Sequence, residues 1–269
     1  MYSLIIAGVC GITTGLTLYF TDTFGYGWSI FFGILGFGVV QMSIGLYLQR
    51  KVKAGMKAVE QTLLAGQKEL QAKTQRWQMR PPGSIQAAQN EIARDQRKFV
   101  EAALALTEPL HRFDRWVPMM TRQIATAQFQ LYWMIKEYRK CDALMDKALF
   151  VEPTMYAMKM ARLFTLDRPT DEIRKVYEKG SKRLRYNQNV LLAAAWTWIL
   201  VKRNEIDAAF KALNEALRNS DNETLKANRD ALANNRIAHF SNSGIGDTWW
   251  ALGLEEPKVK MQRQRMQWR

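Results

Sequence analysis

Two adjoining stretches at the start of the chain carry almost no charge: YSLIIAGVCGITTGLTLYF at 2–20 and TFGYGWSIFFGILGFGVVQMSIGLYLQ at 23–49. Each is long enough to cross a hydrocarbon core of about 30 Å as a helix. The polar, glycine-rich segment 21–27 between them suits a tight turn. A cleaved signal peptide is disfavoured, because no basic region precedes the first stretch and a second apolar stretch follows at once. The sequence therefore predicts a transmembrane hairpin over 1–49.

The charges that flank this hairpin predict its orientation. Basic residues stay on the cytoplasmic side, and the only charged residue within 1–49 is Asp22 in the turn. We expect both termini and the soluble part to be cytoplasmic, at the inner membrane of a bacterium or an equivalent membrane. A transporter or channel core is disfavoured, because neither span contains an ionisable residue. The basic residues that follow the second span are Arg50, Lys51, Lys53 and Lys57.

Small residues recur along both spans and allow helix backbones to approach closely. The pattern favours packing of the hairpin on itself, and oligomerisation or docking against a membrane partner is the alternative. The candidate packing residues are Ala7, Gly11, Gly15, Gly33 and Gly36.

All 39 Lys and Arg residues lie after Gln49, against 24 acidic residues there, so this part carries a net charge of +15. Such an excess implies an anionic neighbour, either a membrane surface or nucleic acid, or a solvated surface without a partner. The last residues form a basic amphipathic tail, which suits lipid headgroups, nucleic acid or an acidic partner, or is a disordered tail without a role. Together with the four bases after the hairpin, its candidate membrane-surface residues are Lys258, Lys260, Arg263, Arg265 and Trp268.

Residues 50–80 are predicted to form a juxtamembrane helix. Its apolar positions alternate at spacings of four and three, which is a partial coiled-coil seam. The seam either pairs two copies of the chain or packs on the next helix. Pro81-Pro82-Gly83 ends this helix, and Ser84 is the expected N-cap of the next. We assign 81–120 to connecting and capping helices.

A period of 34 residues follows. Tyr138, Cys141 and Ala148, which precede Glu152-Pro153, are repeated 68 residues later by Ile206, Ala209 and Ala216. A degenerate copy begins at Thr170. The large-small-small pattern, the period and the terminating residues resemble the tetratricopeptide repeat. The resemblance is clearest over Tyr138–Pro153, covers about 121–221, and is weighed against an ordinary helical bundle.

The resemblance implies an all-α chain in which the transmembrane hairpin precedes about three helix pairs over 121–236, arranged as a short α-solenoid. It also implies a concave groove that binds a protein or peptide. A Trp-rich segment and the basic tail make up 237–269, and Trp249, Trp250, Leu252 and Leu254 are expected to plug the solenoid end or to form a binding patch. The candidate partner-binding residues are Tyr132, Trp133, Tyr156, Arg162, Trp196 and Trp198.

No catalytic or cofactor motif and no metal-ligand spacing stands out, so we expect no enzyme, no cofactor and no metal site. The leading hypothesis is a membrane-anchored scaffold or adaptor for protein–protein interaction at the cytoplasmic face. The alternative is a structural or assembly subunit of a larger membrane complex, with a possible homo-oligomer. A nucleic-acid-binding membrane tether comes third, because no nucleic-acid module is recognisable.

Overall fold

The computed structural model describes residues 2–21, 25–79, 84–182, 184 and 186–257, and this part of the chain is helical without a strand. The chain divides into two compact units, Met1–Leu149 and Phe150–Arg269. The division falls inside the segment 121–236, which the sequence analysis assigned to one repeat domain. Each unit is therefore described by itself.

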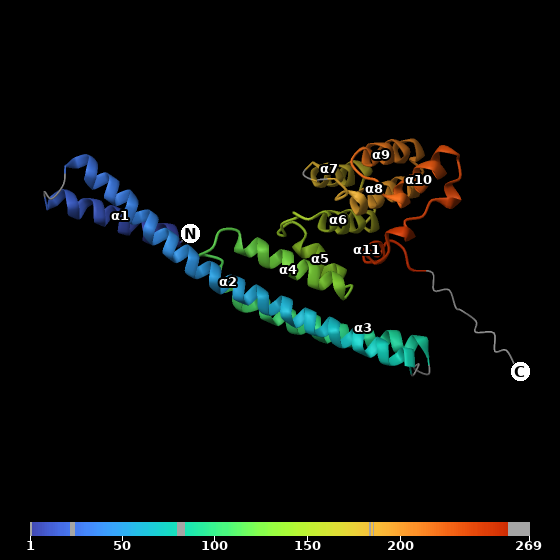
Figure 1. The fold of residues 1–269 in the computed structure, drawn as a ribbon, viewed down its shortest axis with the longest axis horizontal. Coiled ribbons are helices and arrows are strands. Elements are labelled where there is room, and N and C mark those ends of the chain that lie inside the picture. Colours follow the sequence, from blue (N-terminus) through green and yellow to red (C-terminus); the bar gives the residue numbers. More distant parts are fainter. Residues whose placement is uncertain (1, 22–24, 80–83, 183, 185, 258–269) are drawn as a thin grey trace, which may run out of the picture. The chain divides into compact units, whose positions relative to one another are not determined.

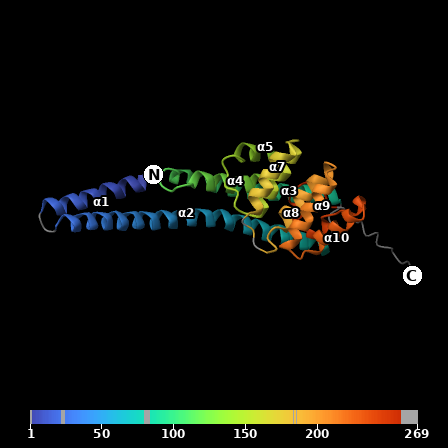
Figure 2. The ribbon, with the colours of Figure 1, turned by 90° about the horizontal axis from the view of Figure 1, so that it is seen from above.

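The first unit begins with two antiparallel helices, α1 (Tyr2–Phe20) and α2 (Tyr26–Met79) (Figure 1). They lie side by side in both views (Figure 2), and their contact is the most extensive between any two elements described. Both helices are long and apolar enough to cross a membrane. The predicted bounds of the first span are those of α1, because an uncharged run without proline has no reason to end earlier.

Helix α2 continues for 54 residues without a break. At about 1.5 Å per residue it is roughly 80 Å long. The boundary that the sequence analysis placed after residue 49 is therefore a change of surface and not an end of a helix. The sequence turns from apolar to charged at Arg50, but no proline or turn signal interrupts the backbone there.

Helix α3 (Ile85–Thr107) returns along the charged half of α2, and the 3₁₀-helix η1 (Glu108–Phe113) follows it (Figure 1). The predicted seam packs here within one chain: Val59 is buried with Val100 and Ala103 of α3. Gly55 and Gly66 of α2 leave room for the side chains of Leu110 and Phe99. This finding favours the second of the two predicted roles of the seam.

An ion-pair cluster also joins α2 to α3. Lys73 Nζ lies 2.5 Å from Asp95 Oδ2 and also pairs with Glu91. The hydrogen bond from Lys73 lowers the pKa of the Asp95 carboxyl, and the two carboxylates raise the pKa of Lys73. A lowered acid pKa and a raised base pKa both mean that the cluster stabilises the fold between the ordinary values of 3.8 and 10.5 and weakens outside this range.

The first unit ends with α4 (Met120–Met134) and α5 (Tyr138–Leu144). Met120 and Ile124 of α4 form a core with Leu48 of α2 and with Leu110 and Phe113 of η1. This core fixes the start of α4 beside the part of α2 where the charge-free run ends.

The second unit contains five helices in sequence, each in contact with the next: α6 (Pro153–Thr165), α7 (Thr170–Ser181), α8 (Val190–Lys202), α9 (Ile206–Arg218) and α10 (Glu223–Ala233). Helix α6 also contacts α8. The small residues of the repeat pattern lie at these contacts: Ala209 and Ala216 are buried, and a Cβ on Gly180 would lie 2.8 Å from Cγ of Tyr156.

Four helices end in the same turn. After α4, α6, α8 and α10, the second residue beyond the helix adopts a left-handed conformation, with φ of 59° at Lys136, 53° at Asp167, 61° at Asn204 and 53° at Asn235. In each turn this residue donates its N–H to the carbonyl three residues before it, and the next N–H reaches back five residues, as Glu137 does to Tyr132. This is the Schellman motif, and it ends the first helix of every expected pair.

The last pair is incomplete, because α10 is followed by η2 (Ile237–His239), η3 (Ser243–Ile245) and the short helix α11 (Asp247–Trp250). Trp249 and Leu252 are buried in the core of the second unit, as the plug interpretation predicted, whereas Trp250 is partly exposed. Both carboxylate oxygens of Glu255 accept indole N–H bonds, from Trp198 at 2.8 Å and from Trp249 at 2.9 Å.

Candidate functional site

The first candidate surface is the outside of the hairpin. Of the large apolar side chains that are exposed in the described residues, 19 lie between Tyr2 and Tyr47 and only seven lie in the rest of the chain. Ile12 and Ile34, on opposite helices of the hairpin, are 65% and 67% exposed. Water does not stabilise so large an apolar surface, which marks a region that contacts lipid or protein.

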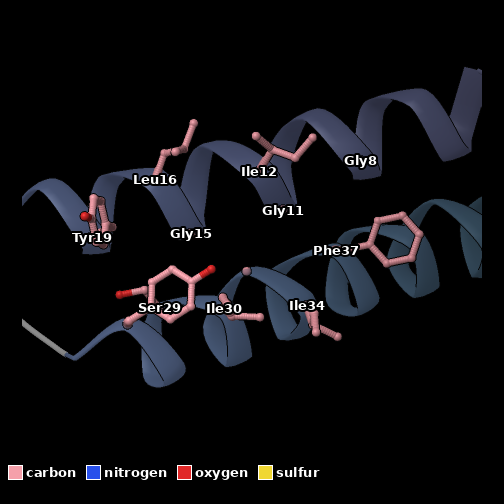
Figure 3. Close-up of a pocket in the computed structure, with 12 residues that line it drawn as sticks. Gly8, Gly11, Ile12, Gly15, Leu16, Tyr19, Ser29, Ile30, Ile34 and Phe37 are labelled. Carbon is pink, nitrogen blue, oxygen red and sulfur yellow. The ribbon is translucent and has the colours of Figure 1, made fainter.

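The contact between α1 and α2 depends on glycine. A Cβ on Gly11 would lie 2.8 Å from the carbonyl oxygen of Gly33 and 2.8 Å from Cβ of Phe37. Gly15 faces the backbone of Ser29 and Gly33, and Gly36 contacts Thr14. Figure 3 shows Gly11 and Gly15 on the side of α1 that faces α2. With Ala7, which is fully buried, the structure thus places all five candidate packing residues at this contact.

Three other glycines of the hairpin have open space around them. No atom lies within 4 Å of a Cβ built on Gly8, Gly38 or Gly45. Gly38 and Gly45 are seven residues apart and therefore lie on one face of α2. This face is not used by the hairpin itself.

The predicted basic residues after the hairpin are all exposed along the next turns of α2: Arg50, Lys51, Lys53 and Lys57. Lys51 Nζ lies 5.7 Å from the ring centroid of Tyr47. The other predicted membrane-surface residues, Lys258, Lys260, Arg263, Arg265 and Trp268, lie outside the described residues.

The start of α1 is fastened beside this basic stretch, which sequence reasoning missed. The backbone N–H of Tyr2 donates to the carbonyl of Arg115 at 3.0 Å, and Ser3 Oγ donates to the carbonyl of Trp116 at 3.3 Å. The rings of Tyr2 and Trp116 meet edge to face at 5.5 Å. The only sequence signal was an aromatic and basic run, His111 to Trp116, without an assigned role.

The predicted partner-binding residues need correction. Trp133, Trp196 and Trp198 are at most 5% exposed and Tyr156 is 9% exposed, so these four side chains belong to the core. Trp196 stacks on Tyr177 at 5.5 Å, and Trp198 packs against Phe164 and Trp249. Large aromatic side chains on a close-packed helix contribute most by burial, which explains their position. Tyr132 and Arg162 remain partly exposed.

A polar groove of about 640 Å³ lies elsewhere on the second unit, where the N-terminal ends of α6, α8 and α10 meet the segment 245–248. Asn187 holds its wall: its backbone N–H donates to the carbonyl of Asn219, and its side-chain oxygen accepts from the N–H of Asp221. Asn222 caps α10. The lining residues are Pro153, Thr154, Asn187, Gln188, Val190, Leu191, Asp221, Asn222, Ile245 and Thr248.

The sequence contained a signal for this groove. Pro153, Asn187 and Asp221 line it, and they are spaced 34 residues apart, which is the period of the repeat. We had used this period to place helices and had chosen aromatic residues within them. The helix starts, with their polar capping residues, form the groove instead.

Catalytic geometry does not emerge from the residues that the structure describes. They contain no group of three or more His, Cys, Asp or Glu side chains that could hold a metal ion. His111 Nδ1 lies 2.9 Å from Asp114 Oδ2 in an exposed pair without a nucleophile beside it. Comparisons with protein-family models, with curated proteins and with solved structures found no match to this chain.

Proposed function

We propose that this chain is a membrane-anchored scaffold or adaptor, in which α1 and the first part of α2 insert into a bilayer and the helical remainder binds a protein or peptide. The observation that carries the anchor is the exposed apolar surface between Tyr2 and Tyr47. The core helix of a soluble protein would be covered, but only 17% of α1 and 6% of the apolar window of α2 are buried.

The binding role rests on the polar groove at the starts of α6, α8 and α10. Its walls offer amide and hydroxyl groups from Asn187, Asn222 and Thr154, which suit hydrogen bonds to an extended peptide backbone. The repeated Schellman turns support a tetratricopeptide-like arrangement of helix pairs, an architecture that presents concave binding surfaces.

The orientation follows from Arg50, Lys51, Lys53 and Lys57, which would hold the soluble part in the cytoplasm. We expect the full chain to stay in the membrane fraction at alkaline pH. In sealed inside-out vesicles, added protease should digest the soluble part. Its protection in those vesicles would contradict the proposed orientation, and extraction by alkali would contradict the anchor.

Partner binding is tested by a photo-crosslinking residue in the groove of the full chain in native membranes. We expect a residue placed at Thr248, which is exposed and lines the groove, to give a discrete protein adduct. The control position is Lys211, an exposed residue in a separate groove beside Trp196. Equal adducts from both positions, or none from Thr248, would contradict a binding role of this groove.

A structural or assembly subunit of a membrane complex is the second candidate function. The unused face of Gly38 and Gly45 favours it, because small residues without a partner in the hairpin allow another membrane helix to approach. Native mass spectrometry of the detergent-solubilised chain separates the two: a stable homo-oligomer or complex that depends on Gly38 supports assembly.

A further inference from the structure

A second, apolar pocket of about 730 Å³ lies in the first unit, where the hairpin joins the soluble helices. Tyr47 and Leu48 of α2 form one wall, Phe113 and Trp116 form the other, and Ser43 and Arg112 complete the lining used in this argument. We propose that this pocket binds one anionic phospholipid, with the acyl chain against the aromatic wall and the phosphate at Arg112. The proposal rests on the proposed membrane anchor.

The pocket lies at the level where a bilayer would end. Ser43 and Tyr47 belong to the charge-free run of α2, whereas Arg50 is its first charged residue. Tyr47 is 61% exposed, and tyrosine prefers the interface between hydrocarbon and water. One side of the pocket is thus continuous with the apolar surface of the hairpin, and the other side reaches the basic turns.

The charge around the pocket favours an anion. The guanidinium of Arg112 lies 4.7 Å from the ring centroid of Phe113, and among the described residues no carboxylate forms an ion pair with it. Lys51 Nζ lies over Tyr47, which lines the pocket. The nearest acid in sequence to Arg112, Asp114, has one oxygen paired with His111. A phosphate would therefore meet two cations without displacing an existing ion pair.

The walls exist before any ligand binds. Leu48 and Phe113 are each 8% exposed and belong to a core with Met120 and Ile124. The bond from Ser3 to the carbonyl of Trp116 fixes the remaining wall. A preformed site loses little conformational entropy on binding, which favours a defined lipid over the general annular layer.

The test titrates the full chain in detergent with dioleoylphosphatidylglycerol, dioleoylphosphatidylcholine or inorganic phosphate and counts bound ligand by native mass spectrometry. We expect saturable binding of one phosphatidylglycerol, weaker binding of phosphatidylcholine and none of phosphate. Arg112→Gln should weaken phosphatidylglycerol binding about fivefold, as expected for one base near an anionic headgroup. Ser43→Trp, which fills the pocket and keeps every charge, should weaken both lipids.

The matched control is Arg122→Gln, which removes an exposed arginine of α4 in the same unit. Equal binding of both lipids by the wild-type chain, or an equal loss in the Arg122 and Arg112 variants, would overturn the site. Alkaline extraction distinguishes this failure from failure of the anchor: the Arg112 variant should stay in the membrane fraction, whereas extraction of the wild-type chain would overturn the anchor itself.

Discussion

Replacing Trp249 by alanine is expected to destabilise the second unit by about 3–5 kcal/mol, the usual cost of removing a buried aromatic side chain. Trp249 is fully buried, and its ring centroid lies 6.0 Å from that of Trp198. The substitution leaves a cavity and also removes one of the two indole N–H groups that bind Glu255. A loss of this size approaches the whole stability of many domains.

Hydrogen exchange of the full chain in detergent measures this loss. We expect protection of α8 and α10 to fall strongly in the Trp249→Ala variant, while α2 and α3 of the first unit keep theirs. Trp250→Ala is the control, because this neighbouring tryptophan is partly exposed and should cost under about 1 kcal/mol. Equal effects of the two variants would show that the segment after α10 does not complete the core.

Gly11→Leu is expected to open the membrane hairpin. Its Cβ would lie 2.8 Å from a backbone oxygen of the facing helix, and a backbone cannot rotate away as a side chain does. Overpacking of this kind costs about 1–3 kcal/mol, which shifts the equilibrium between closed and open hairpin roughly 5- to 150-fold. The matched control is Gly8→Leu on the same helix, where nothing lies within 4 Å.

The two cysteines provide the measurement. Cys10 lies beside Gly11 and is partly buried, whereas Cys141 is fully buried in the soluble part. In detergent, maleimide labelling of Cys10 should accelerate in the Gly11 variant, and Cys141 should stay protected because the soluble helices are untouched. If Gly8→Leu accelerates labelling as much, the glycine contact does not hold the hairpin.

Prediction from the sequence succeeded where one local property determines the structure. The uncharged run 2–20 gave the bounds of α1, and Thr107-Glu108-Pro109 marked the end of α3 correctly. Ser84 is at the N-cap position, although its side chain makes no capping bond. The period of 34 placed Ala209 and Ala216 in the core for a reason that the packing of α9 shows.

Prediction failed where the answer depends on tertiary contacts. Nothing local separates Trp196 as a core residue from a tryptophan that faces a partner, because both lie on an apolar helix. The left-handed turns at Lys136 and Asp167 carry no glycine, so their repetition appears only in the backbone. The lipid pocket combines Tyr47 with Trp116, which are distant in sequence and meet only through the packing of η1 on α2.

The unbroken course of α2 makes the protein mechanically simple. Each residue of an α-helix adds about 1.5 Å of height and about 100° of rotation. The length of α2 beyond Arg50 therefore acts as a ruler and a dial together, setting how far from the bilayer α3 packs and which compass direction it faces. A tilt or turn of the hairpin in the bilayer would be passed along this rod without a joint to absorb it.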